Sequence, residues 1–588
     1  ATSKRVMRCP LPANQRRSIS HGWITSSNSE SVSPTRGESA VSEQVYGGLV
    51  STHTVTNQPP PLVHNTFADD PALREAVAAF GADADDPGLA GLGELAGSEQ
   101  ARDWGRLANE YTPVLHTFNR YGQRIDEVEF HPAWHELMTV AVDHGLHAAP
   151  WVADDKAAHV KRAAGFMTWS QAEAGHGCPI SMTYASVPAL RVDPQRAEQW
   201  EAGLASREYD FGLRAPSDKR GLIAGMSMTE KQGGSDVRTN STIAEASGDD
   251  YLLTGHKWFC SAPMSDLFLV LAQAPGGLTC FIVPRVLDDG SRNVFEIQRL
   301  KDKLGNRSNA SSEIEFDGTW AQRLGDEGRG VRTIVEMVSA TRLDCVLGST
   351  ALMRKAVSEA VWHASHRSAF GARLIDQPLM RQVLADMALE VEAATWLGLR
   401  LAHAVDTADS AEQRAFRRIA LPMSKYYVCK RAPGLTFEAM ECLGGPGYVE
   451  ETGLPRLYRE APVNSIWEGS GNVNALDLLR AMSRNPESLD AYLQALAPAA
   501  GCDEAFDALL SEVLNALAAG TSEARARWLA EKMVLLLQTA LLVQHAPGFV
   551  TDAFVATRLR QNEGTYGVVD LGAQDVTAIL ERATPRGF

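Results

Sequence analysis

Residues 464–472 read NSIWEGSGN and place a lone glutamate, Glu468, among glycines and small residues. An isolated stretch of this kind predicts no more than a glycine-rich turn. Two large apolar residues, Ile466 and Trp467, precede the glutamate, however. A carboxylate that such side chains and a bound ligand shield from water has a raised pKa and is a stronger base than an exposed one. The stretch therefore nominates Glu468 as a catalytic base if other motifs agree.

A second motif, MTEKQGGSD at 228–236, offers a cradle for a flat ring or a phosphate. Its glycine pair, Gly233 and Gly234, allows the backbone to approach a ligand closely. Thr229 and Ser235 place hydroxyl groups beside the glycines, where they can donate hydrogen bonds. The motif therefore predicts one wall of a ligand site.

Three more motifs follow along the chain: GHKWFCS at 255–261, HRSAFG at 366–371 and ECLGGPGY at 441–448. Trp258 in the first of them offers a large aromatic face to a flat ring. In this order and spacing, and together with NSIWEGSGN, the motifs resemble the acyl-CoA dehydrogenase family, most closely its AidB-type adaptive-response branch. The resemblance extends from about residue 52 to about residue 570.

The apolar pattern predicts a mainly α chain with a central β-domain. Short apolar runs such as LFLVLAQ and LTCFIVP, split by Gly, Pro and Asp, are typical of strands, whereas the flanking segments have helical periodicity. The resemblance implies the acyl-CoA dehydrogenase fold: N-terminal helices, a β-barrel-like middle, a C-terminal four-helix bundle, and here an extra C-terminal helical domain. We expect a disordered leader at 1–51, an N-terminal helical domain at 52–221, the β-domain at 222–330, the bundle at 331–483 and the extra domain at 484–588.

Two helix faces can be predicted from the apolar spacing. One follows Gly330 and consists of Val331, Ile334, Val335 and Val338. The other lies in the extra domain and consists of Phe506, Leu509, Leu510, Val513, Leu514 and Leu517. We expect both faces to be buried.

Composition describes an ordinary soluble protein of 588 residues, 44% hydrophobic and 22% charged, with a net charge of −16. Its longest apolar stretch, at 534–543, is too short to cross a bilayer, so no membrane partner is expected. The eight cysteines lack paired spacing, which predicts reduced thiols and a cytoplasmic location. The histidines of HPAWH and HGLH lack the acidic partner of a metal motif, so we expect structural histidines and no metal: His131, His135, His144 and His147.

The first forty residues differ in composition from the rest of the chain. They hold nine Ser, six Lys or Arg and only two Glu, without apolar periodicity. Such a segment is typical of disorder. It is either a mitochondrial transit peptide, which would place the protein in the mitochondrial matrix, or a leader from an over-long reading frame, which we favour.

The resemblance implies FAD as the cofactor. No G-x-G-x-x-G motif stands between a predicted strand and helix, which disfavours NAD in a Rossmann unit. Cys260 replaces a hydroxyl residue that is common in relatives, so we expect its flavin hydrogen bond from Ser261 instead. The resemblance assigns the flavin contacts of one subunit to Met228, Thr229, Gly234, Ser235, Trp258, Ser261, Ser470 and Asn472.

In this family the flavin site is shared between subunits, which implies a homotetramer built as a dimer of dimers. Glu441 stands where many relatives have glutamine, and a carboxylate near a pyrophosphate is unfavourable unless an arginine lies close. An electron-transfer flavoprotein is a candidate electron acceptor. The contacts to the adenine–pyrophosphate end of the neighbouring subunit's FAD are assigned to Arg367, Phe370, Gln377, Glu441 and Gly445.

The reaction that the resemblance implies is α,β-oxidation of an acyl-CoA, with Glu468 as the base. The family's second position for a base holds Thr341 here, which cannot act as one. Arg342 matches an arginine that orients the acyl-CoA, so we expect it to face the cleft. Trp467 replaces the usual tyrosine and would narrow the acyl pocket. This predicts a short or branched acyl group, as in isovaleryl-CoA.

Two alternatives stay open at the level of sequence. The first is a DNA-binding protein that protects against alkylation stress through its C-terminal domain, with weak or vestigial dehydrogenase activity. Residues 483–588 hold eight basic and thirteen acidic residues, which opposes broad phosphate binding, although four arginines could form a narrow patch: Arg525, Arg527, Arg558 and Arg560. The second alternative is an oxidase of the same fold that passes electrons to oxygen.

Overall fold

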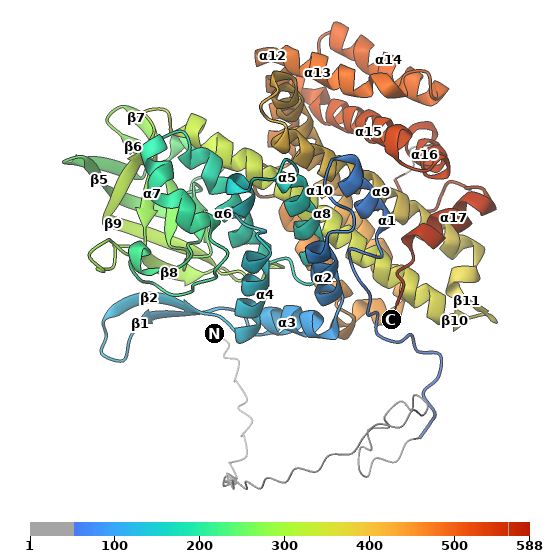
Figure 1. The fold of residues 1–588 in the computed structure, drawn as a ribbon, viewed down its shortest axis with the longest axis horizontal. Coiled ribbons are helices and arrows are strands. Elements are labelled where there is room, and N and C mark those ends of the chain that lie inside the picture. The colour runs from blue at the N-terminus through green and yellow to red at the C-terminus, as the bar shows by residue number, and fades with distance from the viewer. Residues whose placement is uncertain (1–51, 562–563, 588) are drawn as a thin grey trace, which may run out of the picture. The chain divides into compact units, whose positions relative to one another are not determined.

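The computed structural model of this chain describes residues 52–561 and 564–587, so the leader predicted at 1–51 lies outside it. Contacts divide the chain into one unit at 1–56 and a second at 57–588. All the helices and strands below belong to the second unit. They follow the order of helices, sheet, long helices and further helices that the sequence predicts (Figure 1).

The N-terminal part consists of helices with well-defined starts. Four of them, α1, α2, α4 and α7, begin at a proline whose preceding residue accepts a backbone hydrogen bond as an N-cap. Proline fits the first helical position because its missing N–H has no partner there anyway. The helices are α1 (Pro71–Ala79), α2 (Pro87–Ala96), α3 (Glu99–Glu110), α4 (Pro132–Asp143), α5 (Ala158–Trp169), α6 (Gly177–Leu190) and α7 (Pro194–Ala205).

This part also contains an antiparallel hairpin that the mainly helical prediction missed, with strands β1 (Val114–Phe118) and β2 (Arg124–Glu129). Asn119 forms the turn, since its Oδ1 accepts from the N–H groups of Tyr121 and Gln123. Gly122 completes the turn with φ 77°. The N-x-x-G turn between two alternating segments was the signal for this hairpin.

The central part is a seven-stranded sheet that closes into a barrel. Strand β6 pairs with β4 on one edge and β7 on the other, and the path β4–β5–β9–β7 returns to β6. Strand β3 runs parallel to β6, and β8 pairs with β9. The strands are β3 (Ala224–Ser227), β4 (Ile243–Ser247), β5 (Asp250–Ser261), β6 (Leu267–Ala274), β7 (Gly277–Pro284), β8 (Glu296–Leu300) and β9 (Ser311–Leu324).

Strands β6 and β7 contain the predicted runs LFLVLAQ and LTCFIVP, so the structure confirms them as strands. Both faces of β6 are buried, which explains why its apolar residues are continuous rather than alternating. Phe268 and Val270 belong to the main hydrophobic core. Leu269 and Leu271 belong to a second core, which includes Met182 of α6. These side chains fix the barrel against the N-terminal helices.

Three long helices pack against one another beside the barrel: α8 (Gly330–His366), α9 (Pro378–Asp406) and α10 (Ala411–Leu443). The predicted face of α8 is only partly correct. Ile334 is buried, but Val335 is 46% exposed. The buried stripe of α8 contains Met337 and Ala340 instead, because this is the stripe that packs against the barrel's outer core. Val331, Val335 and Val338 line an open cleft.

Shorter helices complete the fold around α9 and α10 (Figure 1). On α14, Phe506 and Val513 of the predicted stripe are buried, whereas Leu514 is 40% exposed. No helix in the described ranges is long and apolar enough to cross a membrane. The helices are α11 (Leu454–Glu460), α12 (Gly471–Arg484), α13 (Glu487–Leu496), α14 (Glu504–Ala518), α15 (Ala526–His545), α16 (Gly548–Phe554), the π-helix η10 (Val555–Arg560) and α17 (Ala573–Ala583).

Candidate active site

Glu468 lies in the turn between the 3₁₀ helix η7 (Ala461–Ser465) and α12. Its backbone is left-handed, with φ 55°, which is uncommon for a residue other than glycine. The side chain is half-buried, and its Oε2 accepts a hydrogen bond from Thr341 Oγ1 at 2.6 Å. Burial raises the pKa of Glu468, while this hydrogen bond and the charges of Lys425 and Arg342 offset part of the rise. The carboxylate is therefore a base of increased strength.

Arg342 and Trp467, predicted to contact the substrate, both lie beside Glu468. Arg342 Nε donates to the Glu468 carbonyl at 3.0 Å, and its Nη1 pairs with Asp477 at 2.7 Å. The indole N–H of Trp467 donates to Asn464 Oδ1 at 3.0 Å. These contacts make Arg342 part of the wall behind the base as well as a lining residue of the neighbouring cleft.

The predicted flavin-binding residues of the β-domain lie together on two neighbouring segments. The backbone N–H of Trp258 donates to the carbonyl of Thr229 at 2.8 Å. Gly234 lies against Thr229, because a Cβ added to Gly234 would be 2.5 Å from Thr229 Oγ1. The Met228 carbonyl accepts from Asn240 Nδ2 at 2.9 Å. The structure thus places the hydroxyl group of Thr229 and the ring of Trp258 on adjoining segments.

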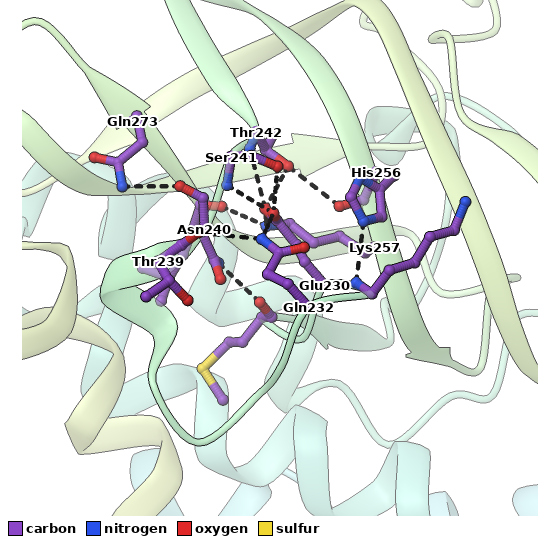
Figure 2. Close-up of polar contacts among 12 residues, drawn as sticks. Glu230, Gln232, Thr239, Asn240, Ser241, Thr242, His256, Lys257 and Gln273 are labelled. Atoms are coloured by element: carbon purple, nitrogen blue, oxygen red, sulfur yellow. Dashed lines mark hydrogen bonds and ion pairs between the residues drawn. The ribbon is translucent and has the colours of Figure 1, made fainter.

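A buried ion pair fixes these two segments to each other (Figure 2). Glu230 follows Thr229, Lys257 precedes Trp258, and Lys257 Nζ lies 2.8 Å from Glu230 Oε1 with both side chains fully buried. The Glu230 carboxylate also accepts hydrogen bonds from Ser241, Thr242 and Gln232 (Figure 2). Burial alone would raise the pKa of Glu230, but Lys257 and these donors outweigh it and hold the pKa below its usual range. Burial lowers the pKa of Lys257 to about 8.

Ser261 is the last residue of β5. Its Oγ lies 3.1 Å from Ser311 Oγ, whereas the side chain of Cys260 is buried. Cys178, at the start of α6, lies near both Ser261 and Glu468, and burial raises its pKa to about 11. Cys178 therefore has both the catalytic candidate and one predicted flavin contact in its surroundings.

The predicted residues at the start of α12 are engaged by the C-terminal helices. Ser470 is the residue before α12, and its carbonyl accepts from Asn474 Nδ2 at 3.1 Å. Asn472 is exposed, and its Oδ1 accepts from Arg527 Nε at 2.7 Å. This arginine comes from α15, so the extra domain reaches the edge of the site.

The residues assigned to the neighbouring subunit's FAD are exposed or half-exposed. Phe370 is 100% exposed at the tip of the hairpin of β10 (Ser368–Ala369) and β11 (Ala372–Arg373), with φ 53°. Arg367 and Gln377 flank this hairpin, whereas Glu441 and Gly445 lie on either side of the end of α10. An aromatic side chain that is fully exposed on a turn is a candidate for covering by another protein surface.

A cleft that the sequence did not predict lies between the β-domain and helices α8, α10 and α12. Its volume is about 950 Å³, and it contains both Ser235 and Arg342. We call it the arginine cleft, because seven arginines line it: Arg238, Arg342, Arg414, Arg417, Arg418, Arg480 and Arg484. Asp236, Glu336 and Asp477 are its acidic lining residues. The helical spacing of Arg414, Arg417 and Arg418 was the only signal in the sequence.

The four histidines considered for a metal have structural contacts. His131 Nδ1 accepts from Ala133 N at the start of α4, and His135 Nδ1 lies 3.1 Å from the Tyr209 hydroxyl. His144 Nδ1 lies 3.0 Å from the Val140 carbonyl, and His147 Nε2 lies 2.7 Å from the Ser206 carbonyl. No group of three metal-binding side chains occurs among residues 52–561 and 564–587.

The arginines proposed for a DNA-binding patch also have partners within the protein. Arg558 is buried, and its Nη1 pairs with Asp386 Oδ1 at 2.6 Å, so its prediction as a surface residue is wrong. Arg560 pairs with Asp503, and the Arg525 guanidinium lies 4.1 Å from the ring centroid of Trp528. This buried pair links η10 to α9, where Asp386 lies.

Comparison with known proteins establishes the relationship of the chain. AidB of Escherichia coli (strain K12) is 46% identical over 537 residues, which cover 91% of this chain and 98% of AidB. The chain belongs to the acyl-CoA dehydrogenase family. Family models agree: the adaptive response protein AidB N-terminal domain matches 57–211, the acyl-CoA dehydrogenase middle domain 225–319, and its C-terminal domain 328–483.

Two solved structures of similar proteins cover most of this chain. Bd2924 in its apo-form has a TM-score of 0.77 and 30% identity, covering 84% of this chain and all of that one. Caenorhabditis elegans ACDH-11 in complex with C11-CoA has a TM-score of 0.77 and 28% identity, covering 92% and 93%. The acyl-CoA dehydrogenase fold predicted from the motifs is therefore confirmed.

Members of this family are FAD-dependent oxidoreductases, and the residues near Thr229 fit such a cofactor. A flavin needs a flat surface and hydrogen-bond donors along its polar edge. Trp258 would supply the surface, and the Thr229 and Ser261 hydroxyl groups would be the donors. Gly234 leaves room for close approach, because it has no Cβ to fill the space.

Proposed function

We propose that this protein is an FAD-dependent acyl-CoA dehydrogenase that oxidises a short or branched acyl-CoA with Glu468 as its base. The observation that carries this proposal is a desolvated carboxylate, held in a left-handed turn, whose contact Arg342 lines the arginine cleft, with Trp258 on the β-domain as the surface for the flavin. These are the three parts that the reaction requires: a base, a surface for the flavin and a site for an anionic substrate.

Glu468 would take the α-proton of the acyl thioester onto its carboxylate. The raised pKa makes this transfer more favourable, since a base is most effective when its pKa approaches the working pH. Bound FAD would supply the acceptor for the hydride that leaves the β-carbon. Thr341, by donating to Oε2, orients the carboxylate and leaves Oε1 for the proton.

The arginine cleft supports coenzyme A as the carrier of the acyl group. Coenzyme A has a phosphorylated adenosine diphosphate, whose negative charges match arginine in charge and in hydrogen-bond geometry. Arg342 lies in this cleft and also contacts the Glu468 backbone, so the cleft adjoins the base. Trp467 lies next to Glu468, and its large ring would narrow the acyl pocket, which supports an acyl group of the size of isovaleryl.

The test is anaerobic titration of the purified yellow protein with isovaleryl-CoA, undecanoyl-CoA and palmitoyl-CoA, while flavin absorbance is recorded. The second thioester is included because the C. elegans structure holds C11-CoA. We expect isovaleryl-CoA to bleach the parent and the Glu412→Gln control, whose exposed glutamate lies at the start of α10, but not Glu468→Gln. Bleaching by palmitoyl-CoA alone would overturn the choice of substrate. If dithionite reduces the parent but no thioester does, the dehydrogenase proposal is wrong.

Two further assignments accompany this proposal. We infer a homotetramer, supported by the exposed Phe370 hairpin, and an electron-transfer flavoprotein as the electron acceptor. Slow reoxidation in air after bleaching would support a dehydrogenase, and fast reoxidation with peroxide release would support an oxidase. Arg558 is buried and Arg560 is ion-paired, so the C-terminal arginines give no support to DNA binding as a second function.

A further inference from the structure

The turn that carries Glu468 has its backbone carbonyls held by three side chains from three helices. Lys425 of α10 donates to the carbonyls of Trp467 and Gly469, at 2.7 and 2.5 Å. Arg342 of α8 donates to the carbonyl of Glu468 itself. Asn474 of α12 donates to the carbonyls of residues 469 and 470. Four consecutive carbonyls, those of residues 467–470, thus each accept a hydrogen bond from a side chain.

Lys425 is the unusual member of this set, because it is a buried lysine with 1% exposure. It forms no ion pair within the described ranges, and its two hydrogen bonds go to neutral carbonyls. A buried charge is costly unless paired, and an arrangement that retains one calls for a reason. The two acceptors flank Glu468, so the ammonium group is hydrogen-bonded to the turn on both sides of the base.

We propose that Lys425 is a positioning residue of the dehydrogenation, and this inference rests on the proposed function of Glu468. Its ammonium group holds the carbonyls of Trp467 and Gly469 together, which keeps Glu468 in its left-handed conformation with the carboxylate beside Thr341. Its positive charge also favours the ionised form of that carboxylate, which is the form that accepts the proton. Geometry and charge are therefore supplied by one side chain.

The left-handed backbone gives the geometric part its physical basis. A non-glycine residue with φ near 55° is strained, and such strain persists only where the surroundings enforce it. Without Lys425, the carbonyl of Trp467 loses its side-chain donor and that of Gly469 keeps only Asn474, so no side chain joins the two carbonyls that flank Glu468. Misplacement of a reacting group by about 1 Å can reduce a rate about a hundredfold.

Several groups besides Lys425 influence the charge of Glu468. Arg342 and Cys345 belong to α8, and Cys178 belongs to α6. Burial raises the pKa of both thiols, so they stay neutral near pH 7. The two cations, Lys425 and Arg342, are therefore the charged groups that can shift the titration of Glu468. A change at Lys425 alone must appear in the pH dependence of the reaction.

Two substitutions separate the geometric role from the electrostatic one. Lys425→Met removes both the donor and the charge at nearly constant length, whereas Lys425→Gln keeps a donor and removes the charge. Lys219→Met is the matched control, because Lys219 is also a buried lysine, paired with Asp266 in the β-domain. That control reveals the effect of losing a buried ammonium group away from the base.

The holoenzymes are compared by two measurements. The first is the pH dependence of the rate of anaerobic bleaching by isovaleryl-CoA. The second, which does not require turnover, is hydrogen–deuterium exchange of the amides of residues 466–471. For Lys425→Met we expect a rate about tenfold to a hundredfold lower, an acid limb at higher pH and faster exchange in this segment. For Lys425→Gln we expect exchange close to that of the parent but a displaced acid limb.

The inference is overturned if folded Lys425→Met has the same bleaching rate, the same acid limb and the same amide exchange as the parent. It is also overturned if the acid limb is displaced in Lys219→Met. If Lys425→Met does not fold, Lys425→Gln decides alone, and a parental limb in that variant refutes the electrostatic role. If the parent itself does not bleach, the proposed function fails. The exchange of residues 466–471 then still tests whether Lys425 holds the turn.

Discussion

Replacement of Lys257 by methionine should destabilise the protein severely, because it leaves the buried carboxylate of Glu230 without its positively charged partner. Both side chains are fully buried, at 0% exposure, and their atoms are 2.8 Å apart (Figure 2). The remaining donors, from Ser241, Thr242 and Gln232, are neutral and cannot balance the carboxylate. Breaking a buried ion pair from one side costs about 3–5 kcal/mol. We expect a loss of this size in the free energy of unfolding.

Urea unfolding of the holoenzyme at pH 7 measures this loss. Lys156→Met, at an exposed lysine, is the control and should change the unfolding free energy by less than about 0.5 kcal/mol. The double variant Lys257→Met/Glu230→Gln should recover part of the stability, since no buried charge is then left without a partner. A single variant that loses less than about 1 kcal/mol would refute the reasoning. Lys257→Met should also release FAD more readily, because Thr229 and Trp258 adjoin the pair.

Three other outcomes follow from the pKa shifts and contacts. Thr341→Val removes a hydrogen bond that lowers the pKa of Glu468, so the acid limb of the bleaching rate should move to higher pH; an unchanged limb would contradict the contact. Burial lowers the pKa of His147 from 6.5 to about 4, so the unfolded chain binds more protons between these values. Stability should fall by about 3 kcal/mol as the pH drops through that window, and His147→Gln should show a smaller fall in acid unfolding curves. Arg582→Ala leaves Glu392 buried beside no cation and should cost about 2 kcal/mol in urea unfolding. Since burial raises the pKa of Glu392, that cost should be smaller at pH 5 than at pH 7, and equal costs would argue against it.

The sequence predicted best where neighbouring residues form one local motif. The strands β6 and β7 follow directly from their apolar runs. The motifs around Thr229 and Trp258, which the family resemblance assigns to one flavin site, lie on segments that a backbone hydrogen bond joins. For β6 and β7 the local pattern contained the information, because apolar runs and the turn residues that bound them act over short distances.

Tertiary contacts explain what the sequence left out. Lys425 belongs to a long helix, where a lysine is ordinarily a surface residue, and only the packing of α10 against the Glu468 turn buries it. The arginine cleft likewise combines residues from α8, α10, α12 and the β-domain. Arg558 was misjudged for the same reason, since Asp386 lies far from it in the chain. Composition alone cannot indicate which charges will meet.

The left-handed backbone at Glu468 has a consequence for any survey of substitutions at this position. Asparagine and aspartate adopt this conformation more readily than other residues with a side chain, and glycine adopts it freely, whereas valine and isoleucine resist it. How well the fold tolerates a substitution at residue 468 should therefore depend first on the backbone preference of the new residue and only then on its acidity. A glycine variant could be more stable than the parent and still be inactive. A valine variant would lose both its activity and its folded structure. Activity and abundance should thus be scored separately here, because the residue that performs the chemistry occupies a backbone position better suited to another amino acid.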